Sequence, residues 1–544
     1  MSTLFTGGSV FDGHRHLPGH DLLVEAGQVV AVLGPDSVVE WTRDHDVVDL
    51  AGGLVAPGFT DAHCHPIQGG LEMTRCDLSE GHTRDDYLAT IASYAASYDG
   101  PWVLGGGWAM PAFPGGTPTA ADLDSVVPDR PVFLPNRDHH GAWVNTRALE
   151  AAGITAETPD PADGRIERLP DGSPSGTLHE GAMALVARLL PPTPAEAYAA
   201  GLREGQQYLF SLGVTAWQDA IVGAYAGMDD SGPTYVDAVA NGDLVADVVG
   251  ALWWDRTLGL AQIPDLVARR AALSSGRFRA TSVKIMQDGV LENGTAALGT
   301  PYLDRCGHAT DNAGHSFVDG AELKEVVAAL AAEGFQVHVH AIGDRGVREA
   351  LDAFEVARGL GGEDVRHHIA HLQLVHPDDV PRFESLGVAA NAQALWACNE
   401  EQMTELTIPF LGPERATWQY PFGGLHRSGA RLVMGSDWPV TSPDPLAAIH
   451  TAVTRTSYGE DGPAGRDPFL PEQALDLTTA FAAYTSGSAW VNGRDRTDGA
   501  GVLAPGHAAD LVVLDRDPFT GPADEIGATR VSSTWVGGQC VHAS

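Results

Sequence analysis

Short apolar runs recur along the central part of the chain, and stretches with helical periodicity separate them. This alternation is typical of parallel strands joined by crossover helices. The runs that predict strands lie at 54–61, 214–219, 248–253, 282–286, 336–341, 368–372, 388–392 and 431–437. Eight such units close a barrel, so the sequence predicts an α/β fold of the (β/α)8, TIM type.

Both ends of the chain carry further β-type runs bounded by glycine and proline, at 22–26, 29–33, 510–515 and 531–536. They predict a small composite β-sandwich domain formed by residues 1–53 and 500–544, beside a barrel domain at 54–499. The segment at about 66–200 follows the first predicted strand and is too long for a barrel connection. We interpret it as an insertion near the mouth of the barrel.

The net charge of the chain disfavours some classes of binding partner. Among 544 residues, 33 are Lys or Arg and 71 are Asp or Glu, which gives a net charge of −38. Such a chain repels nucleic acids and anionic membranes, so neither is expected as a partner. No apolar run has the length of a membrane span, and the first residues do not resemble a signal peptide. The five cysteines are scattered, which favours reduced thiols and a cytoplasmic location.

The candidate chemistry lies at predicted strand ends. His63 and His65 follow the first strand, and because side chains alternate along a strand they share a face and could bind one metal ion. An isolated pair of this kind is also typical of ordinary core histidines. His340, His371 and Asp437 end the fifth, sixth and eighth predicted strands, and the fourth contains Lys284; these side chains complete the predicted site. Barrel enzymes gather their catalytic groups at this end, which favours a metal centre.

These residues also indicate a family. The segment 57–65, Pro-Gly-Phe-Thr-Asp-Ala-His-Cys-His, together with His340, His371 and Asp437, resembles the metal-dependent amidohydrolase superfamily. Further motifs resemble its YtcJ-like branch, of the amidohydrolase 3 type, which includes N-substituted formamide deformylases; they lie at 107–108, 118–124, 127–132, 138–140, 340–345 and 435–439. The segment 504–514 is similar to the return of the chain into the β-sandwich of that superfamily.

The resemblance implies a divalent metal, with Zn²⁺ as the first choice, in a site of one or two ions. The implied ligands are His63, His65, Lys284, His340, His371 and Asp437. Lys284 is either a carboxylated bridge between two metals or an unmodified group beside one. His338 competes with His340 for the ligand role, but its deeper position favours a hydrogen-bonded core residue.

The resemblance also implies substrate contacts from the insertion. The predicted contact residues are Trp108, His140, Asn145 and Glu180, although loop histidines and an ordinary helix carboxylate would fit the same positions. Trp253, Trp254 and Trp396 could line an apolar pocket, and large aromatics at strand ends are also common in cores.

The predicted reaction is hydrolysis of a carbon–nitrogen bond, other than a peptide bond, in a small amide or N-substituted formamide. Metal-bound hydroxide would attack the carbonyl, with Asp437 as proton shuttle and Lys284 as the second catalytic residue. The alternatives are ester or lactone hydrolysis or decarboxylation on the same barrel, and a non-catalytic, assembly-forming homologue. A homodimer is compatible with the sequence.

Overall fold

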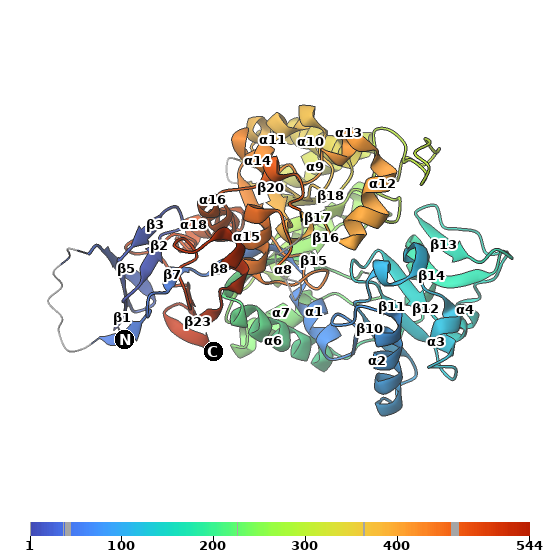
Figure 1. Cartoon of the computed structure of the whole chain (residues 1–544), viewed down its shortest axis with the longest axis horizontal. Coiled ribbons are helices and arrows are strands. Elements are labelled where there is room, and N and C mark those ends of the chain that lie inside the picture. The colour runs from blue at the N-terminus through green and yellow to red at the C-terminus, as the bar shows by residue number, and fades with distance from the viewer. Residues whose placement is uncertain (1, 36, 38–44, 226, 363–364, 459–466) are drawn as a thin grey trace.

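The computed structural model describes residues 2–35, 37, 45–225, 227–362, 365–458 and 467–544. Its centre is a parallel sheet of eight strands, most of which are labelled in the middle of Figure 1. In sheet order these are β8 (Phe59–Cys64), β15 (Val214–Val222), β16 (Asp247–Trp253), β17 (Phe278–Met286), β18 (Gln336–Ala341), β19 (His368–His371), β20 (Ala389–Ala392) and β21 (Leu432–Met434). Backbone hydrogen bonds from Asp437 N to His63 O and from His65 N to Trp438 O, both 2.7 Å, join the two edges. The predicted TIM-type barrel is confirmed.

The first predicted barrel strand, 54–61, is wrong, because this segment is divided between two strands. β7 (Leu54–Pro57) belongs to a different sheet, and the barrel strand β8 begins at Phe59. Gly58 separates them, and a Cβ atom at this position would lie 2.4 Å from the side chain of Thr215. Only glycine leaves room for this close approach between strands.

Helices surround the barrel. The main ones are α1 (Pro66–Met73), α6 (Ala195–Ser211), α7 (Gly232–Asn241), α8 (Ile263–Leu273), α9 (Gly320–Ala332), α10 (Asp344–Ala357), α11 (Val380–Leu386), α14 (Phe422–Arg427) and α15 (Pro445–Thr454). Several begin with a side-chain cap; Asp319, for example, accepts hydrogen bonds from Ala321 N and Glu322 N at the start of α9. Among the described residues, none of the helices combines the length and the apolar character needed to cross a bilayer.

Strands from both ends of the chain form two sheets beside the barrel. One contains β5 (Gln28–Leu33), β4 (Asp21–Glu25), β1 (Ser2–Thr6) and β6 (Asp46–Asp49). The other contains β24 (Gln539–Ala543), β23 (Val531–Val536), β22 (Leu511–Leu514), β7, β2 (Ser9–Phe11) and β3 (His16–Pro18). Phe5, Leu22 and Leu511 belong to one buried apolar cluster that draws on both sheets. The description of this region as a separate sandwich domain stays a prediction.

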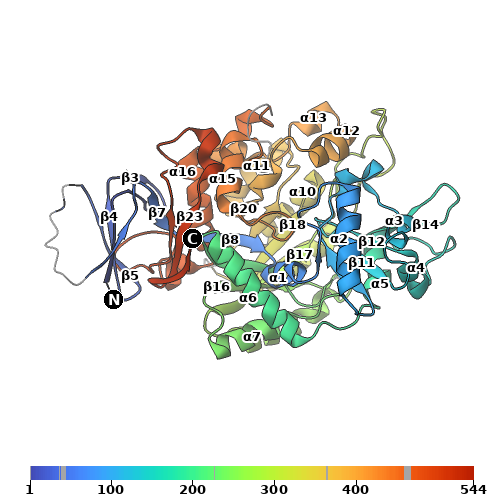
Figure 2. The same cartoon turned by 60° about the horizontal axis from the view of Figure 1, so that its bottom comes forward.

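The segment between β8 and β15 contains a fourth sheet. Its strands, in sheet order, are β13 (Gly164–Arg168), β14 (Pro174–Glu180), β12 (Gly141–Val144), β11 (Val132–Pro135), β10 (Val103–Gly106) and β9 (Cys76–Asp77). Helices α2 (Arg84–Ser97), α3 (Ala120–Asp124), α4 (Thr146–Ala152) and α5 (Ala184–Ala187) accompany it. In both Figures 1 and 2 this insertion lies on the side of the barrel opposite the terminal sheets. It therefore covers part of the barrel's surface that the terminal sheets leave open.

Candidate metal centre and substrate pocket

Two histidines and one aspartate meet at the carboxyl end of the barrel. His63 Nε2 lies 2.9 Å and His65 Nε2 lies 3.0 Å from Asp437 Oδ1. One potential ligand atom from each of the three residues lies within 4.8 Å of the others. The histidines come from the end of β8 and the aspartate from the loop after β21, so closure of the barrel brings them together.

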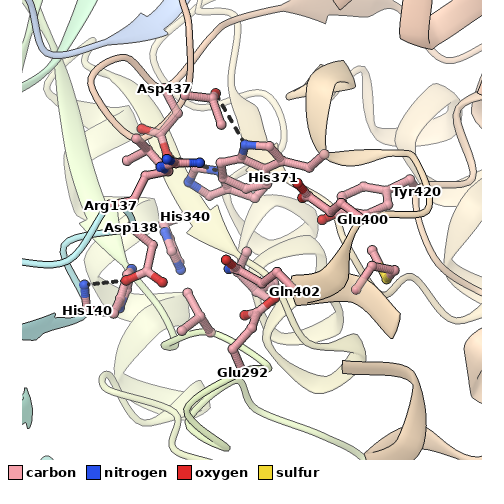
Figure 3. A pocket seen from close by; sticks show the side chains of 16 residues that line it. Arg137, Asp138, His140, Glu292, His340, His371, Glu400, Gln402, Tyr420 and Asp437 are labelled. Carbon is pink, nitrogen blue, oxygen red and sulfur yellow. Dashed lines mark hydrogen bonds and ion pairs between the residues drawn. The ribbon is translucent and has the colours of Figure 1, made fainter. Parts of the chain in front are cut away.

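The other predicted ligands surround this group. Lys284 Nζ lies 3.4 Å from His63 Nε2. The His371 ring lies 4.7 Å from the His63 ring and 4.4 Å from the His340 ring, measured between centroids. His371 Nδ1 is 4.0 Å from Asp437 Oδ2 (Figure 3). The structure therefore brings all six predicted ligands to one end of the barrel.

The local electrostatics favour neutral imidazoles around a carboxylate. Burial, together with the charge of Lys284, lowers the pKa of His63 to about 3. Burial also lowers the pKa values of His340 and His371 well below 6.5 and that of Lys284 to about 7. Burial alone would raise the pKa of Asp437, but His63 and His65 hold it well below 3.8. Neutral imidazole nitrogens and an ionised carboxylate are the forms that bind metals.

The donor set fits a divalent metal. His65 Nδ1 and His371 Nδ1 are buried and have no hydrogen-bond partner among the described residues. Leaving buried polar atoms without partners is unfavourable, and it is tolerated where a ligand completes their environment. Imidazole nitrogen and carboxylate oxygen are typical ligands of zinc and of other first-row divalent ions. His63, His65, His340, His371 and Asp437 are thus the residues that would hold such an ion. Lys284 lies beside them, and it would be a ligand if carboxylated and a neighbouring group if unmodified.

Two supporting groups were not among the predicted site residues. Asp61 Oδ1 accepts hydrogen bonds from His63 N at 2.9 Å and Ser436 N at 3.1 Å, while Asp61 Oδ2 accepts from Ser436 Oγ at 2.5 Å. Asp61 thereby ties the strand that carries His63 to the loop that carries Asp437. Burial raises the pKa of Asp61 to about 7. Because Asp61, His63 and His65 are spaced by two, strand alternation offered a signal for this residue.

His338 lies beneath His63, as its deeper position predicted. Its Nε2 is 2.8 Å from His63 Nδ1, and its ring lies 3.9 Å from the His368 ring. His368 in turn contacts Gln218 Oε1 through Nε2 at 3.0 Å and accepts from Asn391 Nδ2 at 3.2 Å. His338 therefore orients the His63 ring from inside the barrel through one hydrogen bond, and the hydrogen-bonded His368 ring packs against His338.

His140 and Glu180 from the insertion reach the barrel mouth. His140 Nδ1 lies 2.9 Å from Glu180 Oε1, and the His140 ring lies 5.6 Å from that of His340. Burial alone would lower the pKa of His140, but Glu180 raises it to about 9. Glu180 ends β14 rather than lying on a helix, and it adopts a left-handed φ of 52°. Positive φ at a non-glycine residue is a form of local strain that often accompanies functional sites.

Trp108 and Asn145 do not reach the pocket, which corrects their predicted position. Trp108 is buried among aromatic rings of the insertion and donates from Nε1 to Leu134 O at 2.8 Å. Asn145 is fully buried, caps α4 by accepting from Ala148 N, and donates to Val127 O. Both side chains therefore hold the insertion together.

A pocket opens beside the metal centre (Figure 3). Its empty volume is about 690 Å³, including its open mouth. His140, His340, His371 and Asp437 contribute to one wall, and Trp396 stacks on His371 at 5.3 Å between ring centroids. The space suits a small organic molecule whose reacting group lies at the metal centre.

A parallel barrel with these potential metal ligands at its carboxyl end is the arrangement expected of the amidohydrolase type. A model of the amidohydrolase family matches residues 46–542, and the chain belongs to this family.

Three relatives match nearly the whole chain. LONG AFTER FAR-RED 3 from Arabidopsis thaliana is 30% identical, and the match covers 99% of this chain and 91% of that protein. YtcJ from Bacillus subtilis is 27% identical over 96% and 98% of the two chains. The N-substituted formamide deformylase from Arthrobacter pascens is 27% identical over 95% and 94%. The resemblance to the YtcJ-like branch is thus confirmed.

Solved structures agree on the fold. A metal-dependent hydrolase from Pyrococcus furiosus superposes with a TM-score of 0.70 at 25% identity, covering 96% of this chain and all of the other. The zinc complex of an atrazine chlorohydrolase from Arthrobacter aurescens gives 0.53 at 15% identity, over 99% and 95%.

Proposed function

We propose that the protein is a metal-dependent hydrolase that cleaves a carbon–nitrogen bond in a small N-substituted amide or formamide. The observation that carries this proposal is the meeting of His63, His65 and Asp437 at the carboxyl end of the barrel, with ligand atoms within 4.8 Å of one another. Family membership supports it, as do the deformylase among the relatives and the zinc-bound neighbour.

The metal requirement follows from the donor set. When bound, a divalent ion, with zinc as the first choice for these ligands, polarises the substrate carbonyl and lowers the pKa of a water molecule. Asp437 is placed to accept a proton from the attacking water, because its carboxylate is ionised and lies inside the ligand cluster. The carbon–oxygen bond forms as Asp437 takes up this proton, and the carbon–nitrogen bond breaks as Asp437 returns it to the departing nitrogen.

The insertion supplies the substrate contacts in this proposal. His140 lines the pocket beside His340, and Glu180 stabilises its protonated form. A protonated imidazole at this position can donate a hydrogen bond to a substrate oxygen. Lys284 completes the proposed ligand set through its position beside His63.

The test is amine release from a panel of N-substituted formamides, acetamides and aminoacyl amides by the zinc-loaded protein. We expect release from part of the panel and its loss in His340→Ala, since that variant removes one proposed ligand. If the protein instead released acid from esters or lactones, or carbon dioxide from carboxylates, and no amine from the panel, its reaction would be ester or lactone hydrolysis or decarboxylation.

A further inference from the structure

A second chamber lies on the other side of the metal centre, above β15, β16 and β17. Its empty volume, including its open mouth, is about 1150 Å³. The barrel contributes Tyr225, Trp253, Trp254 and Met286 to its lining, and the insertion contributes Met183 among others. We call it the tryptophan chamber, and we call the pocket of Figure 3, above β18 to β21, the acidic chamber.

The two chambers adjoin through the metal centre. A space of about 470 Å³ is lined by His63, His65 and Lys284 and shares residues with both of them. It shares His340, His371 and Asp437 with the acidic chamber. It shares Tyr225, Trp253 and Met286 with the tryptophan chamber. A carbonyl group at the metal centre therefore has room for substituents on both of its sides.

The tryptophan chamber suits an apolar substituent. The rings of Tyr225 and Trp253 lie 4.6 Å apart and form part of its wall. The charged groups in its lining are engaged with other protein groups. Arg256 forms an ion pair with Asp163, and Glu180 Oε1 lies 2.9 Å from His140 Nδ1. Asp255, also in the lining, accepts hydrogen bonds from Thr257 N and Oγ1. Aromatic walls whose charged groups are engaged in this way favour aromatic or alkyl groups.

The acidic chamber suits a positively charged substituent. Its lining contains the carboxylates of Asp138, Glu292 and Glu400 in addition to Asp437, which outnumber the two cationic groups, Arg137 and the protonated His140. Glu292 is buried, which raises its pKa, and its Oε1 accepts a hydrogen bond from Thr407 Oγ1 at 3.0 Å. A cationic ligand group beside a buried carboxylate would offset the unfavourable burial of its charge.

We infer that the natural substrate is a two-armed amide, with an aromatic or alkyl arm in the tryptophan chamber and an ammonium or guanidinium arm in the acidic chamber. A formamide carries only hydrogen on its acyl carbon, so it leaves one chamber empty. Formamides are therefore poor substrates of this protein. The inference rests on the proposed function, because it assigns the amide carbonyl to the metal centre.

Binding of inert analogues tests the two arms separately from hydrolysis. The probes are ketones in which a methylene group replaces the amide nitrogen. One carries a phenylethyl arm and an aminopropyl arm; each of two others lacks one arm. Calorimetry with the zinc-loaded protein measures their Kd values. We expect loss of either arm to raise Kd about tenfold or more, since each arm buries its surface in a matching chamber.

Two variants assign each arm to its chamber. Glu292→Gln should abolish most of the preference for the ammonium arm, whereas Glu325→Gln on the exposed face of α9 should preserve it. Ala184→Phe fills part of the tryptophan chamber from an exposed position and should weaken the preference for the phenyl arm. Ala151→Phe, exposed on α4 and outside the chamber lining, is its matched control.

Equal Kd values for the three ketones would overturn the inference, and so would faster hydrolysis of formamides than of two-armed amides. The second result would leave the proposed amide hydrolysis standing. Preserved arm preferences without hydrolysis of any amide would instead support the two chambers and overturn the proposed reaction.

Discussion

The two ends of the barrel differ in the arrangement of their charged and polar side chains. At the carboxyl end, His63, His65 and Asp437 converge, and buried nitrogens such as His65 Nδ1 have no hydrogen-bond partner among the described residues. At the amino end, charged groups are paired with one another. Arg279 donates to both carboxylate oxygens of Asp247, at 2.7 and 2.8 Å.

Arg494 is the centre of the amino-end network. Its side chain is buried, and its Nη2 lies 2.6 Å from Asp498 Oδ2 and 2.7 Å from Asp510 Oδ2. Asp510 directly precedes β22 of the six-stranded terminal sheet, so this contact connects the barrel to that sheet. Burial would lower the pKa of Arg494, but Asp510, Asp247 and Asp498 raise it above its usual value.

The ion pairs that stabilise the fold and the candidate metal ligands therefore lie at opposite ends of the barrel. The carboxyl end also has left-handed backbone at His371 (φ 82°) and Asp437 (φ 60°), which is unfavourable for residues other than glycine. Such strain persists where the surrounding structure holds the residues in place. We therefore expect substitutions at the carboxyl end to change catalysis and metal binding, and substitutions at the amino end to change folding.

The largest expected effect is that of Asp437→Asn. An amide cannot accept the proton of the attacking water, so turnover should fall by about 10²- to 10⁴-fold. Steady-state amine release, with metal content measured on the same sample, checks this result. Near-normal turnover with the metal retained would remove Asp437 from the proton-transfer role.

Arg494→Met should lower the free energy of unfolding by about 3–5 kcal/mol, because it leaves buried carboxylates without their cation. The amidase activity per folded molecule should stay unchanged. Urea unfolding measures the loss, and Arg203→Met on the exposed face of α6 is the control. If Arg494→Met lost activity without losing stability, the assignment of stability to the amino end and of catalysis to the carboxyl end would be contradicted.

His338→Asn should weaken metal binding by about 10- to 100-fold, since it removes the partner that orients His63. Competition with a zinc chelator measures the affinity independently of activity. A purely structural role of His338 would lower the unfolding temperature while leaving the metal affinity of the folded protein unchanged.

Asn145→Ala should lower the free energy of unfolding by about 1–2 kcal/mol through loss of the α4 cap, and further through loss of its buried hydrogen bonds with Val127 O and Val132 N, with little change in kcat/KM. Thermal unfolding and steady-state kinetics distinguish the two effects. A large increase in KM in a fully folded variant would instead indicate that Asn145 contacts the substrate, as the sequence predicted.

The smallest expected effect is a pH dependence at the amino end. Burial would raise the pKa of Asp247, but its hydrogen bond with Arg279 and the nearby arginines lower it below 3.8. The stability supplied by ionised Asp247 is therefore complete above pH 3.8 and is lost as the pH falls through the lower, folded-state pKa. The stability difference between the native protein and Asp247→Asn should be constant near neutral pH and narrow below pH 3.8 in urea titrations. If this stability difference widened on acidification, folding would raise the pKa of Asp247 rather than lower it.

Much of the barrel could be predicted because its strands are apolar runs separated by amphipathic helices. The exception, 54–61, shows the limit of this pattern. β7 and β8 are both fully buried, so hydrophobicity does not reveal that they pair with different sheets. The close contact of Gly58 with Thr215 depends on a strand more than a hundred residues away in sequence.

The positions of the six proposed ligands were predictable because strand ends of a barrel meet at one place. The contacts of Asp61 and His338 depend on how neighbouring strands align, which alternation along one strand does not specify. Trp108 and Asn145 show a second limit, since a family motif contains scaffold residues as well as residues of the pocket.

The most direct test of the metal-centre account is amine release by one protein sample before metal removal, after exhaustive chelation, and after addition of zinc. We predict that hydrolysis of a two-armed amide disappears with the metal and returns at a stoichiometry of one or two ions per chain. Undiminished amine release from metal-free protein would contradict it.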